Sequence, residues 1–358
     1  MKKFNVLGLM SGTSLDGLDL AYCQFWQKKD MWNYKINNTK SVTYSSAFKD
    51  KLKNAISLPA SELLELNSTY GAWLGEQSKL FIDEGQLTVD IIASHGHTTH
   101  HQPNKGFTYQ IGSGQHIANY TNCKTICDFR SNDVALGGQG APLVPIGDKH
   151  LFGTYDFCLN LGGISNVSFQ QNNNRIAYDI GIANMALNYM TQKIDLAYDH
   201  NGDLAKKGEL NQHLLDQLNA LEYYKLPFPK STGYEWFLKE IVPLLEATND
   251  ALENILHTLG IHICDKISEN LLSLKDKAKN TLLITGGGAF NAFLITTLQE
   301  KLGPTFSIAP ASSTLIEFKE ALIFAFMGVL RNIGQNNVLS SVTGATKDSC
   351  SGVIYVPQ

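Results

Sequence analysis

The residues with the clearest chemical potential form a short run of glycines and hydroxyl side chains near the start of the chain. The run comprises Ser11, Gly12, Thr13, Ser14, Leu15, Asp16 and Gly17. Small residues let backbone N–H groups approach an anion closely, and the hydroxyls can donate to phosphate oxygens. Asp16 and Asp19 add carboxylates, which are ligands that Mg²⁺ prefers. The pattern predicts a phosphate site with a magnesium ion beside it.

Two strands are expected to hold this run in place. Residues 5–10 are mostly apolar, and residues 18–23 alternate between two faces as a strand does. The run lacks the Gly-Lys-Ser/Thr of a Walker loop. We therefore expect a β-hairpin that grips phosphate. For one hairpin alone, an ordinary turn in which Gly and Asp only shape the backbone remains the alternative.

A second segment repeats this pattern. Residues 157–169 again read as strand, small-residue turn and strand, and the turn contains Gly162, Gly163 and Ser165. One such hairpin at the start of each of two α/β halves indicates a duplication. Two hairpins facing each other would clamp a polyphosphate from both sides.

A glycine triplet is the third candidate for nucleotide contact. Gly286, Gly287 and Gly288 follow the apolar residues 281–285, and Asn291 lies near the start of the next predicted helix. Backbone without side chains can approach an adenosine closely, and a helix N-terminus favours negative charge. A tight turn between a strand and a helix is the alternative interpretation.

The remaining elements follow from hydrophobic periodicity. The sequence predicts helices at 61–81, 115–120, from 250, from 291 and at 315–331, and further strands at 42–45, 90–94, 125–129, 175–179, 281–285, 306–308 and 353–356. The expected buried face of the first helix consists of Leu63, Leu66, Tyr70, Trp73 and Leu80. Because a Gly-rich break at 137–140 marks a crossing point, we expect two domains, residues 1–132 and 133–358.

Composition narrows the classes of function. Charged residues make up 17% and hydrophobic residues 43%, and a net charge of −4 without a basic block argues against a nucleic-acid partner. Polar residues 11–14 interrupt the first apolar stretch, and the apolar run 321–330 is far shorter than the ~20 residues that span a bilayer. Six scattered cysteines indicate reduced thiols. We expect a soluble, cytoplasmic protein without a membrane partner.

The segment His95–His101 contains four histidines and suggests a metal site as one hypothesis. On a helix, His97 and His101 would share one face, as metal ligands can. Gly96 and the two threonines that follow a predicted strand favour a substrate-side loop instead.

Motifs in order along nearly the whole chain carry a resemblance to a known family. They are Met10–Asp19, Ser94–Gly96 with Thr98, Asp128–Arg130 with Asp133, Gly137–Pro145, Asn160–Asn166, Pro229–Gly233, Gly286–Ala289 with Asn291, Glu320–Ala321 and Ser341–Ala345. With these motifs the chain resembles the anhydro-N-acetylmuramic acid kinases, within the acetate and sugar kinase/Hsp70/actin superfamily. The resemblance implies an α/β fold of two ribonuclease-H-like (actin-like ATPase) domains flanking a nucleotide and substrate cleft. It also implies ATP and Mg²⁺ as cofactors and a homodimer.

The resemblance further implies a reaction. Family members use ATP and water to open the 1,6-anhydro ring of anhydro-N-acetylmuramic acid and phosphorylate the released O6. The product is N-acetylmuramic acid 6-phosphate, formed during cell-wall recycling. Asp179 stands at the family's base position and would deprotonate the attacking water. A turn aspartate that caps the next helix is the alternative for this residue.

Contacts to the sugar are implied for five side chains. They are His95, Thr98, Arg130, Asn184 and Glu320. A guanidinium pairs with a carboxylate through two hydrogen bonds, so the lactyl carboxylate of the sugar, or a neighbouring group, is the expected partner of Arg130. The alternatives are a surface ion pair with Asp133 for Arg130 and a solvated helix charge for Glu320.

The chain departs from the family pattern at two places. After Asp179 the family usually continues Thr-Gly-Pro-Gly-Asn, with an aspartate a few residues on, whereas this chain has Ile180–Asn184 and then Asn188. His97 stands where a glutamine is usual. These departures leave two alternatives open, a kinase for a related amino sugar and a nucleotide-binding protein with weakened catalysis.

Overall fold

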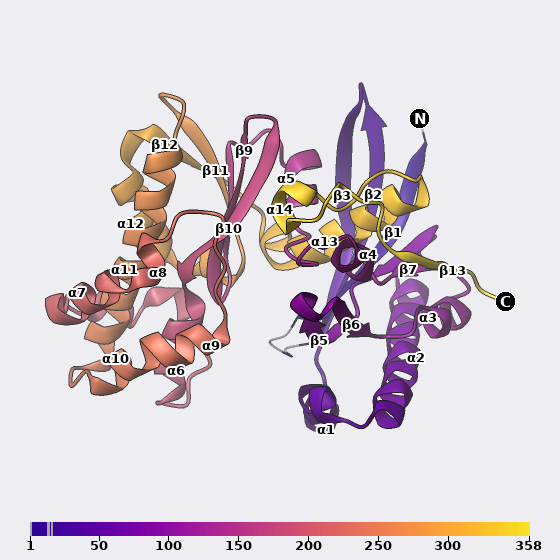
Figure 1. Cartoon of the computed structure of the whole chain (residues 1–358), viewed down its shortest axis with the longest axis horizontal. Coiled ribbons are helices and arrows are strands. Elements are labelled where there is room, and N and C mark those ends of the chain that lie inside the picture. The colour runs from indigo at the N-terminus through magenta and orange to yellow at the C-terminus, as the bar shows by residue number, and fades with distance from the viewer. Residues whose placement is uncertain (1, 13–14, 16) are drawn as a thin grey trace. The chain divides into compact units, whose positions relative to one another are not determined.

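The computed structural model of the chain describes residues 2–12, 15 and 17–358 (Figure 1). It divides into two compact units. Unit 1 consists of Met1–Gly153 and Phe318–Gln358, and unit 2 consists of Thr154–Glu317. This division differs from the predicted boundary between residues 132 and 133, because the last long helix and the C-terminal strand of the chain belong with the first sheet.

Unit 1 is built on a six-stranded sheet with the order β13-β7-β4-β1-β2-β3. Strands β1, β2 and β3 are antiparallel neighbours, whereas β4 and β7 continue the sheet from β1 in parallel. The strands are β1 Lys3–Met10, β2 Leu18–Lys28, β3 Met31–Val42, β4 Ile91–Ser94, β7 Lys124–Cys127 and β13 Val353–Tyr355. A separate antiparallel pair consists of β5 His97–Gln102 and β6 Phe107–Ile111.

Helices pack on the sheet of unit 1 through apolar and very small side chains. Leu7 and Leu9 belong to the same buried cluster as Leu66 and Leu74 of one helix. A Cβ on Gly8 would overlap the carbonyl oxygen of Ala321, so a second helix lies directly on β1. The helices are α1 Ser46–Lys53, α2 Ala60–Glu84, α3 Gly114–Thr121, α4 Ser131–Ala135, α5 Pro145–His150, α13 Ser313–Asn332 and α14 Ser340–Thr343. Helix α13 begins in unit 2 and contributes most of its length to unit 1.

Unit 2 repeats the plan with a five-stranded sheet in the order β10-β9-β8-β11-β12. Strands β8, β9 and β10 are antiparallel, and β11 and β12 continue from β8 in parallel. The strands are β8 Phe157–Leu161, β9 Ile164–Gln171, β10 Asn174–Ile182, β11 Asn280–Thr285 and β12 Phe306–Ala309. The helices are α6 Asn184–Gln192, α7 Gln212–Ala220, α8 Glu222–Lys225, α9 Tyr234–Trp236, α10 Val242–Ala247, α11 Leu252–Leu274 and α12 Ala292–Leu302.

The two sheets confirm the predicted α/β fold and its duplication. In each unit, three antiparallel strands are followed by two parallel ones, which is the strand order of a ribonuclease-H-like sheet. That the two units flank a nucleotide and substrate cleft stays a prediction. No helix in the described part of the chain is long and apolar enough to cross a membrane.

Three local predictions are wrong. Residues 31–42 form strand β3, although only residues 42–45 were expected to be extended, because this strand is largely solvated and shows little apolar alternation. Residues 97–102 form strand β5 rather than a loop, because their pairing with β6 is a contact between segments that local sequence does not report. Leu80 is 47% exposed and does not share the buried face of α2.

Candidate active site

The turn of the first hairpin rests on a buried hydrogen-bonded network. The hydroxyl of Tyr44 donates to Oγ of Ser11 at 2.8 Å and lies 2.8 Å from the hydroxyl of Tyr70. Oγ of Ser11 lies 3.3 Å from Nδ1 of His97. Burial lowers the pKa of His97 to about 4, so its imidazole is neutral at pH 7 and can accept. The Ser11 hydroxyl is therefore engaged inside the protein, and only its backbone stays available for the predicted phosphate contact.

Other predicted residues of this turn serve the fold as well. Leu15 is buried in the core, and its N–H donates to the carbonyl oxygen of Gly12 at 3.3 Å. A Cβ on Gly17 would lie 2.5 Å from the carbonyl oxygen of Val42, so a larger residue would separate the turn from β3. The remaining predicted residues, Thr13, Ser14 and Asp16, lie outside the described part of the chain.

Asp19 on β2 and Glu320 on α13 supply two carboxylates to unit 1. Oδ1 of Asp19 accepts a hydrogen bond from the hydroxyl of Ser41 at 2.6 Å. Desolvation raises the pKa of the Glu320 carboxyl, the charges of Arg130 and Lys319 oppose this, and the negative charge of Asp19 adds to it. The Glu320 side chain nevertheless keeps exposed surface. A solvated helix charge is therefore an incomplete description of Glu320, because charged groups from other elements act on it.

A magnesium ion is compatible with the donor chemistry near Asp19. A carboxylate oxygen suits this ion, which commonly uses one or two protein carboxylates and fills its other positions with water and phosphate. Within the described residues, no group of three or more His, Cys, Asp or Glu side chains could hold a metal. Asp19 could thus contribute a carboxylate oxygen to a water-rich magnesium site.

Arg130 and His95 form one hydrogen-bonded pair in unit 1. Nη2 and Nε of Arg130 donate to Nε2 of His95 at 2.8 and 3.1 Å. A guanidinium cannot accept a hydrogen bond, so Nδ1 of His95 carries the ring proton and donates it to the carbonyl oxygen of Gly96 at 2.9 Å. Burial, with the nearby charge of Arg130, holds the pKa of His95 well below its ordinary value. His95 is therefore neutral with a fixed tautomer.

Arg130 keeps hydrogen-bonding capacity for a ligand. Its Nη1 donates to the carbonyl oxygen of Gly140 at 2.6 Å, so three of the five N–H groups that a guanidinium carries are engaged. Burial lowers the pKa of Arg130 to about 10, against the nearby carboxylates of Glu320 and Asp133, and the side chain stays charged at pH 7. Within the described part of the chain, one N–H on each terminal nitrogen has no hydrogen-bond acceptor, and such a pair of donors suits a carboxylate.

Asp133 does not match the surface ion pair considered for Arg130. Its side chain is fully buried, and its carboxylate accepts from the N–H of Gly140 at 2.8 Å and the hydroxyl of Thr343 at 2.7 Å. The predicted break at residues 137–140 is thus a loop folded around Asp133 and tied to α14. This loop also supplies the carbonyl oxygen of Gly140 that holds Arg130.

The histidine segment places its side chains against different partners. Oγ1 of Thr98 accepts from Nε2 of Gln110 at 3.3 Å across the β5–β6 pair. Nδ1 of His101 lies 3.0 Å from Oγ1 of Thr108, whereas His97 faces Ser11. Because the segment is a strand, the helical spacing of His97 and His101 does not bring them to a common ligand.

Asp179 lies in unit 2 where β10 makes an irregular step. The pairing of β10 with β9 shifts between Asp179 and Gly181. Oδ2 of Asp179 accepts from the hydroxyl of Ser231 at 3.0 Å and from the N–H of Thr232 at 3.1 Å. Burial raises the pKa of the Asp179 carboxyl, and these two hydrogen bonds lower it. A raised pKa suits a carboxylate that must take a proton from water.

The glycine turns of unit 2 meet at the start of α6. The carbonyl oxygen of Gly162 accepts from the N–H of Asn184 at 3.1 Å, and that of Gly163 accepts from the two neighbouring amides. A Cβ on Gly288 would lie 3.2 Å from Oδ1 of Asn184. Gly286 has φ +83°, a conformation that favours glycine. The second hairpin, the glycine triplet and Asn184 are thus adjacent, whereas Asn184 was expected beside the sugar.

Two predicted nucleotide residues use their side chains within the fold. Ser165 is buried, and its hydroxyl donates to the carbonyl oxygen of Gly181 at 3.0 Å. Oδ1 of Asn291 accepts from the N–H of Leu294 at 3.1 Å and so caps α12. Both side chains therefore shape the turns, and the Ser165 hydroxyl and Oδ1 of Asn291 are already engaged there.

Comparison with known proteins decides the family. The sequence pattern of the family described as anhydro-N-acetylmuramic acid kinase matches residues 4–357. The chain belongs to the anhydro-N-acetylmuramic acid kinase family. Proteins with that name from Shewanella woodyi and Actinobacillus pleuropneumoniae serotype 5b are 33% and 34% identical to it. The alignments cover 99% of this chain and 99% and 100% of the two relatives.

The solved structures that resemble this chain do so only distantly. The activator of the 2-hydroxyisocaproyl-CoA dehydratase from Clostridium difficile, with bound ADPNP, has a TM-score of 0.44 at 12% identity. The match covers 92% of this chain and 97% of that one. Component A of the Acidaminococcus fermentans (R)-2-hydroxyglutaryl-CoA dehydratase has a TM-score of 0.43 at 12% identity, with 91% and 97% coverage.

Two sets of supporting residues in this family member could not be recognised from the sequence. The hydroxyl of Tyr44 binds Ser11 and in turn contacts the hydroxyl of Tyr70, and only the burial and mutual contact of the two tyrosines reveal that role. Ser231 and Thr232 bind Asp179, and both belong to the Pro229–Gly233 motif, for which the sequence alone indicated no role beyond the family resemblance. That motif was the available signal, and the fold supplied its target.

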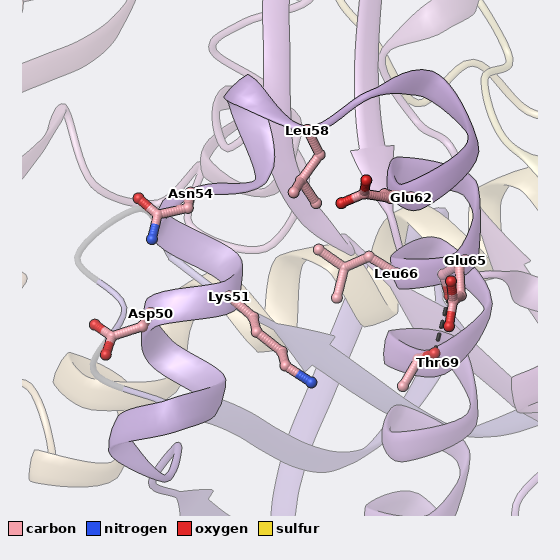
Figure 2. A pocket seen from close by; sticks show the side chains of 8 residues that line it. All are labelled: Asp50, Lys51, Asn54, Leu58, Glu62, Glu65, Leu66 and Thr69. Carbon is pink, nitrogen blue, oxygen red and sulfur yellow. Dashed lines mark hydrogen bonds between the residues drawn. The ribbon is translucent and has the colours of Figure 1, made fainter.

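A surface cavity of about 370 Å³ lies between α1 and α2 of unit 1 (Figure 2). Its lining includes Asp50, Lys51, Glu62 and Glu65. Among the residues that the structure describes, none of those predicted for phosphate, base or sugar contact lines it. The cavity is thus separate from those candidate active-site residues that the structure describes.

Proposed function

We propose that this chain is an ATP-dependent kinase that opens the 1,6-anhydro ring of anhydro-N-acetylmuramic acid with water and phosphorylates the freed O6. The product would be N-acetylmuramic acid 6-phosphate, made during peptidoglycan recycling by a cytoplasmic homodimer. The observation that carries the proposal is the Asp179 carboxylate, which stands at the family's base position with one oxygen held by Ser231 and Thr232. Family membership over residues 4–357 supplies the context.

Asp179 would act as the general base of ring opening. Water attacks the anomeric carbon, its proton passes to the Asp179 carboxylate, and the bond between C1 and O6 breaks. The freed O6 then takes the γ-phosphoryl group from ATP, ADP leaves, and Asp179 returns its proton to solvent. The raised pKa of Asp179 supports this role, because a base works best when its pKa approaches the working pH.

The nucleotide would be held by backbone at the glycine turns. Gly12 and Gly17 in unit 1, and Gly162 and Gly163 in unit 2, can approach phosphate oxygens. The Gly286–Gly288 segment would contact the adenosine, and we place Asn184 on this side because it lies against Gly288. Asp19, together with Asp16, would hold Mg²⁺. Bound Mg²⁺ would neutralise charge on the phosphates.

The sugar would be oriented by residues of unit 1. Arg130 offers its two remaining N–H groups to the lactyl carboxylate, and His95 and Gly140 keep the guanidinium plane fixed. Glu320 would accept hydrogen bonds from sugar hydroxyls, and the Thr98 hydroxyl would accept one from or donate one to the sugar. A neutral His95 suits this arrangement, because a charged imidazole would repel Arg130.

A kinase for a related amino sugar, or a binding protein with weakened catalysis, is the second candidate. The departure after Asp179 favours it, since Ile180 and Ile182 are buried where the family usually has Thr and Pro. The same segment still forms the turn into α6, with the amides of residues 183–185 bound to Gly162 and Gly163. That geometry supports retained activity.

A coupled ADP-release assay tests these candidates. We expect turnover with anhydro-N-acetylmuramic acid, and a product with an open ring and a 6-phosphate by mass spectrometry and NMR. Faster turnover with N-acetylglucosamine would instead support another amino-sugar kinase. ATP binding without turnover on any muramic sugar would support the binding protein.

A further inference from the structure

The segment Pro229–Gly233 lies against Asp179, although the two are about 50 residues apart in the sequence. The carbonyl oxygen of Lys230 accepts from the N–H of Asp179 at 3.1 Å. The next two residues, Ser231 and Thr232, donate to Oδ2 of the same aspartate. Backbone and side chain of Asp179 are therefore both bound by three consecutive residues.

Both side-chain hydrogen bonds end on one oxygen. The Ser231 hydroxyl lies 3.0 Å and the Thr232 N–H 3.1 Å from Oδ2 of Asp179. Among the described residues, no hydrogen bond reaches Oδ1. The pattern fixes the rotation of the carboxylate and leaves the second oxygen free for a water molecule.

The segment is anchored to the backbone that carries Asp179. Nζ of Lys230 donates to the carbonyl oxygen of Tyr223 at 3.1 Å and lies 4.7 Å from the centre of its ring. The hydroxyl of Tyr223 donates to the carbonyl oxygen of Asp179 at 2.7 Å. Contacts among Lys230, Tyr223 and Asp179 thus hold the Ser231 hydroxyl at hydrogen-bonding distance from the Asp179 carboxylate.

We propose that Ser231 is a positioning residue for the reaction, whose hydroxyl holds the Asp179 carboxylate so that Oδ1 faces the attacking water. The inference rests on the proposed function in that Asp179 is the base. Ser231 acts through Asp179 and not on the sugar or nucleotide. Its hydrogen bond also stabilises the charged carboxylate, so removing it should raise the pKa of Asp179.

The variant Ser231→Ala tests this role in the full-length protein. Ser231 is exposed, so the substitution leaves the core intact. We expect kcat with anhydro-N-acetylmuramic acid to fall about tenfold, as the loss of a hydrogen bond to a charged group would cause. The KM values for ATP and sugar should stay within about twofold of wild type, because the residue contacts neither. The acidic limb of the kcat profile should move to higher pH, and Ser231→Thr, which keeps the hydroxyl, should restore both.

A titration without substrate makes the inference independent of the reaction. The ¹³C signal of the Asp179 carboxyl, assigned through Asp179→Asn, should titrate at higher pH in Ser231→Ala than in wild type. Ser273→Ala is the matched control, because that hydroxyl donates to a carbonyl of its own helix. An unchanged Asp179 titration overturns the inference, as does a loss of kcat with an unmoved pH limb. If the Asp179 carboxyl titrates at higher pH in Ser231→Ala as expected, but the wild-type protein does not open the anhydro ring, the result counts against the proposed function alone.

Discussion

At the scale of single residues, Asp179 carries the most consequence. Its carboxylate is oriented by hydrogen bonds to one oxygen and has a pKa raised by burial. The family position and this environment agree on a base. The capping alternative is weaker, because the Asp179 side chain binds Ser231 and Thr232 rather than amides of α6.

The substitution Asp179→Asn removes the proposed base while keeping nearly the same volume. We expect turnover to fall by roughly 10²–10⁴-fold, because an amide cannot take the proton from water. Nucleotide affinity, measured by calorimetry, should change little. Asp276→Asn, an exposed change of the same kind, is the control. Turnover near the wild-type rate in Asp179→Asn would remove this residue from the mechanism.

Arg130 makes a second prediction at this scale. Arg130→Ala should raise the KM for the anhydro sugar by about tenfold or more, because the variant lacks the charged guanidinium that would hydrogen-bond the lactyl carboxylate. The KM for ATP should hold steady in the same steady-state assay. Lys105→Ala removes an exposed charge of unit 1 and serves as control. An unaltered sugar KM in Arg130→Ala would place the lactyl group elsewhere.

At the scale of elements, glycine contacts decide how α13 meets the sheet. Gly8 on β1 touches the backbone of α13 near Ala321, and Gly328 on α13 lies against Ala93 on β4. The same helix pairs Lys319 with Asp148 of α5 at 2.8 Å, with both side chains buried. These contacts fix the position of α13, and with it Glu320, against β1, the strand that leads to the first turn.

The substitution Gly8→Ala should destabilise unit 1. A new methyl group would overlap the carbonyl oxygen of Ala321, and overpacking of this kind costs about 1–3 kcal/mol. Urea unfolding followed by circular dichroism measures the change. Gly287→Ala is the stability control, because its Cβ would find its nearest neighbour 3.8 Å away. Equal stability of Gly8→Ala and wild type would mean that α13 can shift away from β1.

At the scale of the whole molecule, the chain returns to its first unit at the end. Unit 2 is one continuous segment with a complete five-stranded sheet. Unit 1 needs residues 318–358 for α13 and for β13, which pairs with β7. The domain boundary predicted from the Gly-rich break did not anticipate this return.

A fragment experiment tests the discontinuity. Residues 154–317 alone should fold with a cooperative urea transition, because their core is complete. Residues 1–153 alone should lack such a transition, because the sheet face that α13 covers would be exposed to water. Circular dichroism and urea unfolding of both fragments provide the measurement. A cooperative transition in 1–153 would show that α13 is dispensable for that core.

The sequence alone determined most of the β-strands and the long helices, the duplication and the family. Strand alternation, helix periodicity and ordered motifs are properties of neighbouring residues, so they can be read without a fold. Asp179 and Arg130 were proposed on the same basis. The solvated strand β3 and the strand β5 were missed, because their stability comes from pairing with other segments.

Only the tertiary structure decided which side chains are available for chemistry. Folding engaged the hydroxyls of Ser11 and Ser165 inside the protein, placed Asn184 against Gly288 and brought Ser231 to Asp179. These outcomes depend on contacts between residues far apart in the chain. The physical reason is that a buried polar group must find a partner, and only the fold determines which partner lies within reach.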